Sequence, residues 1–384
     1  MADGKVQPFK IDIPDAVLTD LRERLDRTRF PGELRDSGWG YGSNLAYMKE
    51  LVEYWRTRYD WRANERELNR YAHFRADVQG LGIHFIHEKG RGPNPKPLLL
   101  LHGWPGSVYE FQQIIPMLTD PAAHGGDAKD SFTVIAPSLP GYGFSDYPPQ
   151  SINIAEMSPI IHKLMTSALG YDRFCVQGGD WGSVVGSHIA FAFTSNVIGL
   201  HLNMPGVSAS DGANPKSPTE EEKRFLAEAA KFRSEEAGYQ AIQGSRPQTL
   251  AYSLNDSPAG LLAWIVEKFR VWSDCGGDVE KVYSKDQLIT NVMIYWVTQS
   301  IRTSIQLYYE YHHDRWRLKP GTRVEAPTAF AVFPYEIWRP PRNWAERAYN
   351  IQRWTVMPAG GHFAAMEQPQ ALAKDIREFF RGRD

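Results

Sequence analysis

The apolar positions of the first 75 residues follow a helical period. Aliphatic side chains recur at steps of three and four between Pro14 and Arg27, and proline suits the first turn of a helix. The same spacing returns from Asn44 to Tyr59, and a shorter helical stretch runs from Glu65 to Tyr71. The pattern therefore predicts that residues 1–75 form an all-helical extension ahead of the main domain.

After residue 76 the pattern changes to short apolar runs separated by helical stretches. The run from Pro97 to Leu101 is apolar throughout, as expected of a strand that is buried on both faces. Strands that alternate with helices are typical of a doubly wound, mostly parallel sheet, so we expect an α/β fold whose parallel sheet begins at Gly82–His87. The further predicted strands are Phe132–Ala136, Phe174–Gln177, Val197–Asn203, Thr328–Phe333 and Arg353–Met357.

Between about residues 206 and 325 the periodicity is helical, and no strand pattern is found. The predicted helices are Glu220–Lys231, Ala259–Trp272 and Lys285–Tyr311. An insertion that leaves and re-enters a sheet in this way lies above the carboxyl ends of the strands, where ligands bind in open α/β sheets. We therefore expect a helical lid at 206–325 over a core of residues 76–205 and 326–384.

Composition excludes several classes of protein. The chain has 384 residues, and its 42% of hydrophobic residues is enough for a large core and too many for a disordered chain. The 43 basic and 45 acidic residues leave a net charge of -2, which gives no reason to expect a nucleic acid or a membrane as partner. The two cysteines have no CxxC spacing and favour neither a disulfide framework nor a metal site. We expect a cytoplasmic protein, because the sequence shows no signal peptide and no apolar run of about 18 residues.

One strand-to-helix turn carries a candidate nucleophile. The predicted strand Phe174–Gln177 runs into Gly178-Gly-Asp180-Trp-Gly182, and an apolar helical pattern follows. Small residues at 178 and 182 are needed where a tight turn brings a strand against a helix, so the motif matches a nucleophile elbow with aspartate in the place of serine. The alternative is that Asp180 only caps the helix.

A second turn follows the buried run Pro97–Leu101. The segment His102-Gly-Trp104-Pro-Gly106 precedes the elbow in the chain, as an oxyanion-hole loop does. We expect the backbone N–H groups of Trp104 and Trp181 to converge on one oxygen. A plain turn at the end of a strand is the alternative, because glycine and proline are common in loops.

A carboxylate and a histidine follow the last two predicted strands. Glu336 closes the strand Thr328–Phe333, and His362 lies in a glycine-rich loop ahead of a closing helical pattern. Asp180, Glu336 and His362 thus have the chain order nucleophile, acid, base. Two further acidic residues near strand ends are alternatives for the acid: Glu325 and Asp211.

These motifs together resemble the epoxide hydrolases of the α/β-hydrolase fold, in particular the microsomal and juvenile-hormone type with a helical N-terminal extension. The resemblance implies that Asp180 is the nucleophile, Glu336 the acid and His362 the base. It spans nearly the whole chain and rests on the segments Phe9–Pro14, His102–Pro105, Gly178–Gly182, Pro247–Leu250, Leu254–Pro258, Trp264–Lys268 and Gly360–Ala365.

The resemblance also implies two lid tyrosines that donate to the epoxide oxygen. The matching positions are Tyr239 and Tyr308, and the adjacent Tyr309 is the alternative for the second. A phenol with a pKa of about 10 can donate a hydrogen bond or a proton to a departing alkoxide. Packing within the lid is the alternative role for either tyrosine. The sequence starts directly at the helical extension, so a soluble enzyme of the bacterial type is implied.

An aspartate at the elbow determines the expected chemistry. A serine that attacks an epoxide carbon would leave an alkyl ether, whereas a carboxylate leaves an ester that activated water can hydrolyse. We therefore expect conversion of a small-molecule epoxide and water to a vicinal diol, without a metal or an organic cofactor. Trp104, Trp181 and Phe363 flank the machinery and are expected to bind the substrate, which favours a hydrophobic or aryl-substituted epoxide.

Two other functions fit parts of the pattern. A haloalkane dehalogenase also uses an elbow aspartate, often followed by tryptophan, but it holds halide with N–H donors, whereas a tyrosine pair suits an alkoxide. A non-catalytic ligand receptor of the same fold would have a degenerate triad, and here every triad position holds a competent residue. The resemblance is compatible with a homodimer and leaves the physiological epoxide open.

Overall fold

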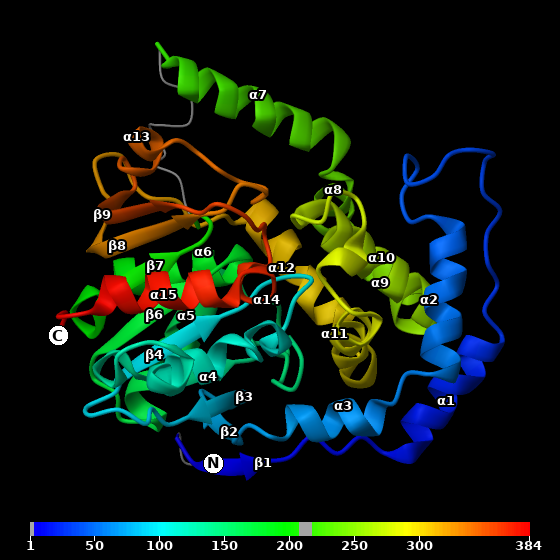
Figure 1. Ribbon diagram of the computed structural model, residues 1–384, viewed down its shortest axis with the longest axis horizontal. Coiled ribbons are helices and arrows are strands. Elements are labelled where there is room, and N and C mark those ends of the chain that lie inside the picture. The colour runs from blue at the N-terminus through cyan, green and yellow to red at the C-terminus, as the bar shows by residue number, and fades with distance from the viewer. Residues whose placement is uncertain (1–3, 207–216) are drawn as a thin grey trace.

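A nine-stranded sheet organises the part of the chain that the structure describes, which is residues 4–206 and 217–384 of a computed structural model. The strands lie in the order β1-β2-β3-β5-β4-β6-β7-β8-β9 (Figure 1). Their bounds are β1 (Val6–Phe9), β2 (His73–Val78), β3 (Leu81–Glu88), β4 (Lys96–Leu101), β5 (Phe132–Pro137), β6 (Phe174–Gly178), β7 (Val197–Leu202), β8 (Val324–Val332) and β9 (Tyr349–Val356). The predicted α/β fold is confirmed.

Strands β5, β4, β6, β7, β8 and β9 pair in parallel, but β1, β2 and β3 are antiparallel. The expectation that the parallel sheet begins at Gly82–His87 is therefore wrong, because this run forms β3 and both of its neighbours are antiparallel. The reason lies in the connection between β2 and β3. Val78 pairs with Leu81, and only Gln79 and Gly80 lie between them. Gln79 and Gly80 both have a positive φ, and a two-residue turn of this kind can join only antiparallel strands.

The expectation of an all-helical extension is also wrong, because β1 and β2 belong to the sheet. A four-residue edge strand such as β1 is too short to show a period in the sequence. Three helices lie between these strands as predicted, although the third begins earlier than Glu65 because the Asp60 side chain accepts from Ala63 N–H and caps it. They are α1 (Asp15–Asp26), α2 (Leu45–Thr57) and α3 (Trp61–Leu68).

Helices cover both faces of the sheet. The core helices are α4 (Ile114–Thr119), α5 (Ile154–Lys163), α6 (Asp180–Ala192), α13 (Arg342–Ala345), α14 (Ala364–Glu367) and α15 (Pro369–Phe380). Alternate residues of β4 face two hydrophobic clusters: Leu99 and Leu101 pack with α5 and α6, whereas Leu98 and Leu100 pack with α4 and α15. This confirms a strand that is buried on both faces.

A buried carboxylate ties α15 to the sheet. Asp375 lies 2.9 Å from His201 Nε2 on β7. It also accepts from Arg353 and Thr355 on β9, at 2.8 and 2.7 Å. Burial alone would raise the pKa of the Asp375 carboxyl, but its hydrogen bonds, first that with His201, outweigh burial and lower the pKa to about 2. The charged carboxylate therefore holds α15 in place, together with the loop that precedes it.

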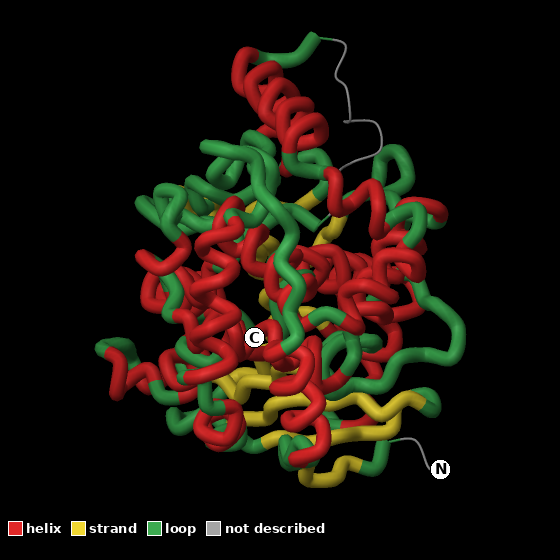
Figure 2. Tube along the Cα trace, turned by 90° about the vertical axis from the view of Figure 1, so that its right-hand side faces the viewer, coloured by secondary structure: helices red, strands yellow, loops and turns green. Residues whose placement is uncertain are grey.

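Within the described residues between β7 and β8, the chain forms six α-helices: α7 (Glu220–Glu235), α8 (Gly238–Gln243), α9 (Pro247–Asp256), α10 (Pro258–Trp272), α11 (Lys285–Thr298) and α12 (Ile301–His313). Helix α7 projects from the top of the molecule, at the opposite end from the strands near the N-terminus (Figure 2). The predicted helix Lys285–Tyr311 is two helices, because Gln299 adopts a φ of 52° and ends α11. A non-glycine residue in this conformation leaves no signal in the sequence.

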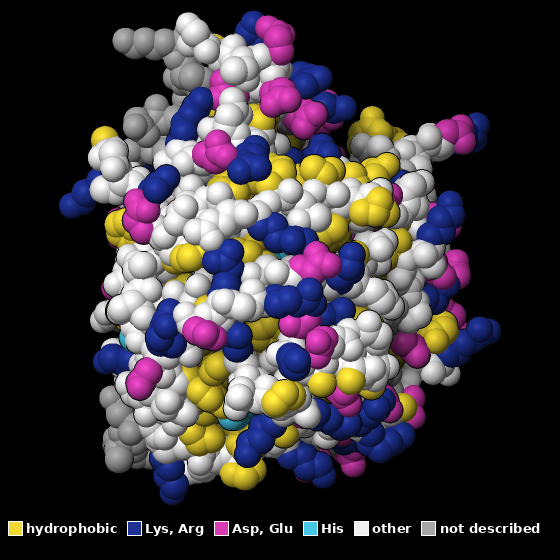
Figure 3. Space-filling view, turned by 60° about the vertical axis from the view of Figure 1, so that its left-hand side comes forward, with side chains coloured by type: hydrophobic (Ala, Val, Ile, Leu, Met, Phe, Trp, Pro, Cys, Tyr) yellow, Lys and Arg dark blue, Asp and Glu magenta, His cyan; other side chains and the backbone are white. Residues whose placement is uncertain are grey.

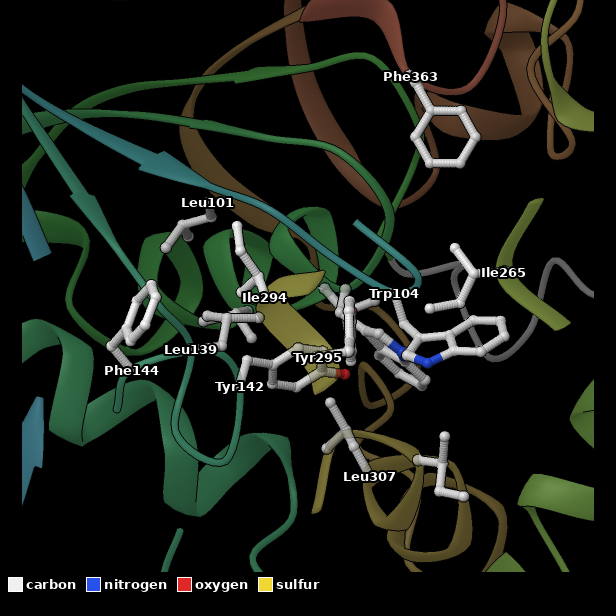
Figure 4. Packing of buried hydrophobic residues seen from close by; sticks show 14 of the residues in the cluster. Leu101, Trp104, Leu139, Tyr142, Phe144, Ile265, Ile294, Tyr295, Leu307 and Phe363 are labelled. Carbon is white, nitrogen blue, oxygen red and sulfur yellow. The ribbon is translucent and has the colours of Figure 1, made fainter. Parts of the chain in front are cut away.

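The N-terminal helices pack on the outer side of this helical insertion (Figure 1). Ser43 Oγ donates to the carbonyl of Ala263 on α10 at 2.9 Å, and the Tyr54 hydroxyl donates to Asp286 on α11 at 3.0 Å. On its inner side, the insertion packs against the sheet through apolar side chains (Figure 4). Those labelled there include Leu101, Leu139, Tyr142, Ile265, Ile294, Tyr295 and Leu307.

Basic and acidic side chains are interspersed over the face drawn in Figure 3, without a large area of one sign. This distribution agrees with the net charge of -2. Among the helices of the described ranges, none combines the length and the apolar character needed to cross a membrane.

Candidate active site

The turn between β6 and α6 places Asp180 in a strained position. Its φ is +47°, in the left-handed region that non-glycine residues rarely adopt and that a nucleophile elbow requires. A Cβ added at Gly178 would overlap with the carbonyl group of Gly182, and one at Gly182 would overlap with that of Leu101. The prediction that positions 178 and 182 need small residues is confirmed.

The two turns singled out in the sequence lie side by side. Strands β4 and β6 are parallel neighbours in which Leu101 pairs with Gly178, so the loop after β4 meets the elbow after β6. The chain passes from β4 to β5 on one side and then to β6 on the other, which makes this edge a topological switch point. Trp104 N–H donates to Asp180 Oδ1 at 2.8 Å, and Trp181 follows in the first turn of α6.

His362 contacts both of the predicted carboxylates. Its Nε2 lies 3.3 Å from Asp180 Oδ2, and its Nδ1 lies 2.7 Å from Glu336 Oε1. Glu336 Oε1 also accepts from the N–H of Ile337 at 2.7 Å. Of the alternative acids, Glu325 is exposed and pairs with Arg323. Asp211 lies outside the described residues.

The charges around His362 favour its protonated form. Burial opposes the charged imidazolium, but the negative charge of Glu336 and the hydrogen bonds with Asp180 and Glu336 outweigh burial and raise the pKa of His362 well above its usual value. Because Asp180 contributes to this rise, neutralising Asp180 would lower the pKa of His362. The imidazole would then accept a proton more readily.

Both predicted tyrosines lie near Asp180. Tyr239 on α8 and Tyr308 on α12 are buried, with ring centroids 5.8 Å apart, and both rings pack against Trp104. Burial, together with the nearby charge of Asp180, raises the pKa of Tyr239 and of Tyr308 above the usual value, so both phenols keep their protons. Tyr309 is 37% exposed and stacks on His313 instead.

A cavity of about 470 Å³ opens onto these groups. Its lining joins Asp180, Trp181 and the two tyrosines to apolar side chains of the insertion and of the loop after β8, such as Phe232 and Trp338. The other two residues expected to bind substrate, Trp104 and Phe363, instead line a smaller cavity with Asp180 and His362.

The sequence analysis missed the groups that hold the loop after β4. Asn291 Nδ2 donates to the carbonyl of Pro105 at 2.7 Å, and the Tyr295 hydroxyl donates to the carbonyl of Gly106 at 2.6 Å. Both donors come from α11 at a spacing of four residues, so they share one face of the helix. Two polar groups at this spacing within the mostly apolar stretch 288–297 were the available signal.

Comparison with known proteins gives a consistent result over nearly the full length. Residues 6–111 match the family described as epoxide hydrolase N terminus, and residues 96–369 match the alpha/beta hydrolase fold. Epoxide hydrolase 1 of Oryctolagus cuniculus is 40% identical over 412 aligned residues, which cover 99% of this chain and 89% of the relative.

Two solved structures are similar in sequence and in fold. The juvenile hormone epoxide hydrolase of the silkworm Bombyx mori superimposes with a TM-score of 0.89 at 35% identity, over 98% of this chain and 94% of that one. The epoxide hydrolase of Aspergillus niger superimposes with a TM-score of 0.86 at 29% identity, over 100% and 98% of the two chains.

Proposed function

Because the chain belongs to the epoxide hydrolase family of the α/β-hydrolase fold, and is an enzyme that hydrates an epoxide to a diol, we propose that it acts through a covalent ester on Asp180. The observation that carries this proposal is the contact of His362 with Asp180 on one side and with Glu336 on the other. Family membership also decides against the haloalkane dehalogenase and the non-catalytic receptor.

In the first half-reaction, a carboxylate oxygen of Asp180 bonds to an epoxide carbon, and the carbon–oxygen bond of the ring breaks. The ring oxygen leaves as an alkoxide and takes a proton from one of the phenols of Tyr239 and Tyr308, which becomes a tyrosinate, while the other donates a hydrogen bond. The lining of one cavity by both tyrosines and Asp180 supports these roles. Residues 206–325, which supply both tyrosines, act as the lid in this proposal.

In the second half-reaction, His362 first gives up its proton, which returns through solvent to the tyrosinate, and then takes a proton from water while the water oxygen bonds to the ester carbonyl carbon of Asp180. The ester has lost the negative charge of Asp180, so the pKa of His362 falls and the imidazole becomes a base. Glu336 orients the ring, and the N–H groups of Trp104 and Trp181 stabilise the tetrahedral oxyanion. The contact of Trp104 N–H with Asp180 supports this assignment.

The tetrahedral intermediate collapses when the bond between the carbonyl carbon and the diol oxygen breaks, and that oxygen takes the proton from His362. The diol leaves, and the proton of the Asp180 carboxylic acid returns to His362.

The cavity lining supports a hydrophobic or aryl-substituted epoxide as the substrate. Aromatic rings contributed by Trp181, Tyr311 and Trp338 supply an apolar surface next to Asp180. Phe363 packs against the insertion instead of lining this cavity, since its ring stacks on that of Phe269 on α10 with centroids 4.0 Å apart. The cytoplasmic location and the homodimer stay predictions.

A single turnover in ¹⁸O-labelled water tests the ester. With enzyme in excess over styrene oxide, the label should enter the Asp180 carboxyl and not the diol, because water attacks the carbonyl carbon and leaves its oxygen on the side chain. Mass spectrometry of the diol and of the peptide that contains Asp180 measures both sites. As a control, many turnovers should carry the label into the diol. A diol that is fully labelled in the first turnover contradicts the scheme.

Replacing both Tyr239 and Tyr308 with phenylalanine should slow ring opening by at least about 100-fold, because the leaving oxygen loses both of its donors. The measurement is the rate of formation of the alkyl-enzyme in stopped-flow fluorescence. Tyr309→Phe is the matched control, since its ring is partly exposed, and it should keep the wild-type rate. Full activity in the double variant would remove both tyrosines from the mechanism.

A further inference from the structure

A second cavity reaches Asp180, and no step proposed above uses it. Its volume is about 20 Å³, which holds one water molecule and excludes an organic substrate. Among the described residues, Asp180 is the one that lines both this cavity and the larger one of about 470 Å³. Asp180 therefore lies between a cavity large enough for an organic substrate and a cavity large enough for one water molecule.

The walls of the small cavity carry the polar groups that a bound water needs. They include the carboxylate of Asp180, the ring of His362 and the carboxyl group of Glu110. The buried amide of Gln177 also lines it, paired with Asn203 through a hydrogen bond of 3.0 Å. Buried waters typically make about three hydrogen bonds, so the lining is sufficient for one.

Glu110 is held in this wall by the loop after β4. It lies in the short 3-10 helix Val108–Phe111, and its carboxyl group packs directly on Gly106, where an added Cβ would overlap with it. Any other residue at 106 would push the carboxyl group away from its place. Glycine at this position therefore fits a carboxyl group held beside the nucleophile.

The surroundings of Glu110 change when Asp180 is esterified. Burial raises the pKa of the Glu110 carboxyl to about 8, and the charge of Asp180 adds to this rise, whereas the charge of His362 and backbone hydrogen bonds from Gly103 and Ser107 oppose it. An ester on Asp180 removes its negative charge, and His362 loses its positive charge at the same stage, so the effects of both charges on Glu110 disappear together. The Glu110 carboxyl group keeps its place against Gly106 at the stage when water must attack.

We propose that this small cavity is the site of the hydrolytic water and that Glu110 positions this water for attack on the Asp180 ester. The inference rests on the proposed covalent mechanism. The water oxygen bonds to the ester carbonyl carbon and one of its protons passes to His362 Nε2. The other hydrogen is held in a hydrogen bond to a carboxyl oxygen of Glu110, which is a positioning residue and takes no proton. Water enters from the side away from the substrate cavity, so the alkyl group does not have to move.

Glu110→Gln keeps the shape of the side chain and should leave alkylation within about twofold of the wild type. Hydrolysis of the ester should fall about 10-fold, as expected when one hydrogen bond is lost. Stopped-flow fluorescence with styrene oxide gives both rate constants. Because only the second step slows, kcat and KM should fall together and kcat/KM should stay unchanged. A role in folding alone would not produce this split.

A second variant tests the cavity without touching Glu110. Ala365 lines the space, and Ala365→Val should fill it and slow hydrolysis of the ester while alkylation persists. Glu67→Gln, an exposed glutamate on α3, is the control for a glutamate-to-glutamine change and should match the wild type. Thermal unfolding checks that each variant is folded.

The outcomes separate this inference from the mechanism on which it rests. If His362→Gln accumulates an adduct on Asp180 but Glu110→Gln and Ala365→Val hydrolyse it at the wild-type rate, the water site is wrong and the ester mechanism stands. If kcat/KM falls as much as kcat in Glu110→Gln, its role is structural and the inference is overturned. If neither the wild type nor any variant forms an adduct with styrene oxide, the ester mechanism itself fails.

Discussion

Asp180→Ala should abolish diol formation, with kcat lower by at least about 10⁴-fold, because no other carboxylate lines the cavity of about 470 Å³ within the described residues. The variant keeps both tyrosines and His362, so the substrate can still bind, but no oxygen is left to form the ester. Diol release from styrene oxide, measured by chiral chromatography, is the readout.

The backbone at Asp180 calls for two controls. Alanine in a left-handed conformation costs roughly 1 kcal/mol, whereas asparagine adopts it more readily, so Asp180→Asn separates loss of the nucleophile from backbone strain. Asp172→Ala removes an exposed aspartate just before β6 and should keep full activity. Normal turnover by folded Asp180→Ala would mean that another group is the nucleophile.

His362→Gln should separate the two half-reactions. Alkylation needs the carboxylate of Asp180, which remains, whereas hydrolysis loses its only proposed base and should slow by about 10³-fold. The ester should therefore accumulate. Intact-protein mass spectrometry after exposure to styrene oxide should show one added substrate, and peptide mapping should place it on Asp180.

A matched histidine variant makes this result specific. His124 is exposed at the end of a short 3-10 helix, and His124→Gln should turn over normally without an adduct. If His362→Gln binds the epoxide but no adduct forms, the two-step scheme is wrong. If the adduct forms and is hydrolysed at the wild-type rate, the base is another group.

The sequence predicted those parts of the site that depend on a short turn or on the order of the strands along the chain. Gly178 and Gly182 are required by a turn of five residues, and the Asp180, Glu336 and His362 order follows the order of the strands. Because the carboxyl ends of parallel strands meet at one edge of a sheet, residues distant in the chain could be placed together without coordinates.

The parts that could not be predicted depend on tertiary contacts. Strand β1 exists because β2 offers an edge, and nothing within its four residues requires a strand. Glu110 looks like an ordinary exposed glutamate in the sequence, and only the approach of Gly106 and His362 gives it a half-buried place near Asp180. The choice between Tyr308 and Tyr309 likewise needed the rotation of α12 about its axis.

The packing of the N-terminal helices has a consequence for how the molecule unfolds. Leu51 of the extension, Ile265 of the insertion and Leu101 of the sheet belong to one continuous hydrophobic cluster. Because the extension, the insertion and the sheet share this cluster, we expect them to unfold together in one cooperative transition. Loss of the extension would therefore loosen the helices that carry Tyr239 and Tyr308, so catalytic geometry and global cooperativity depend on the same buried surface.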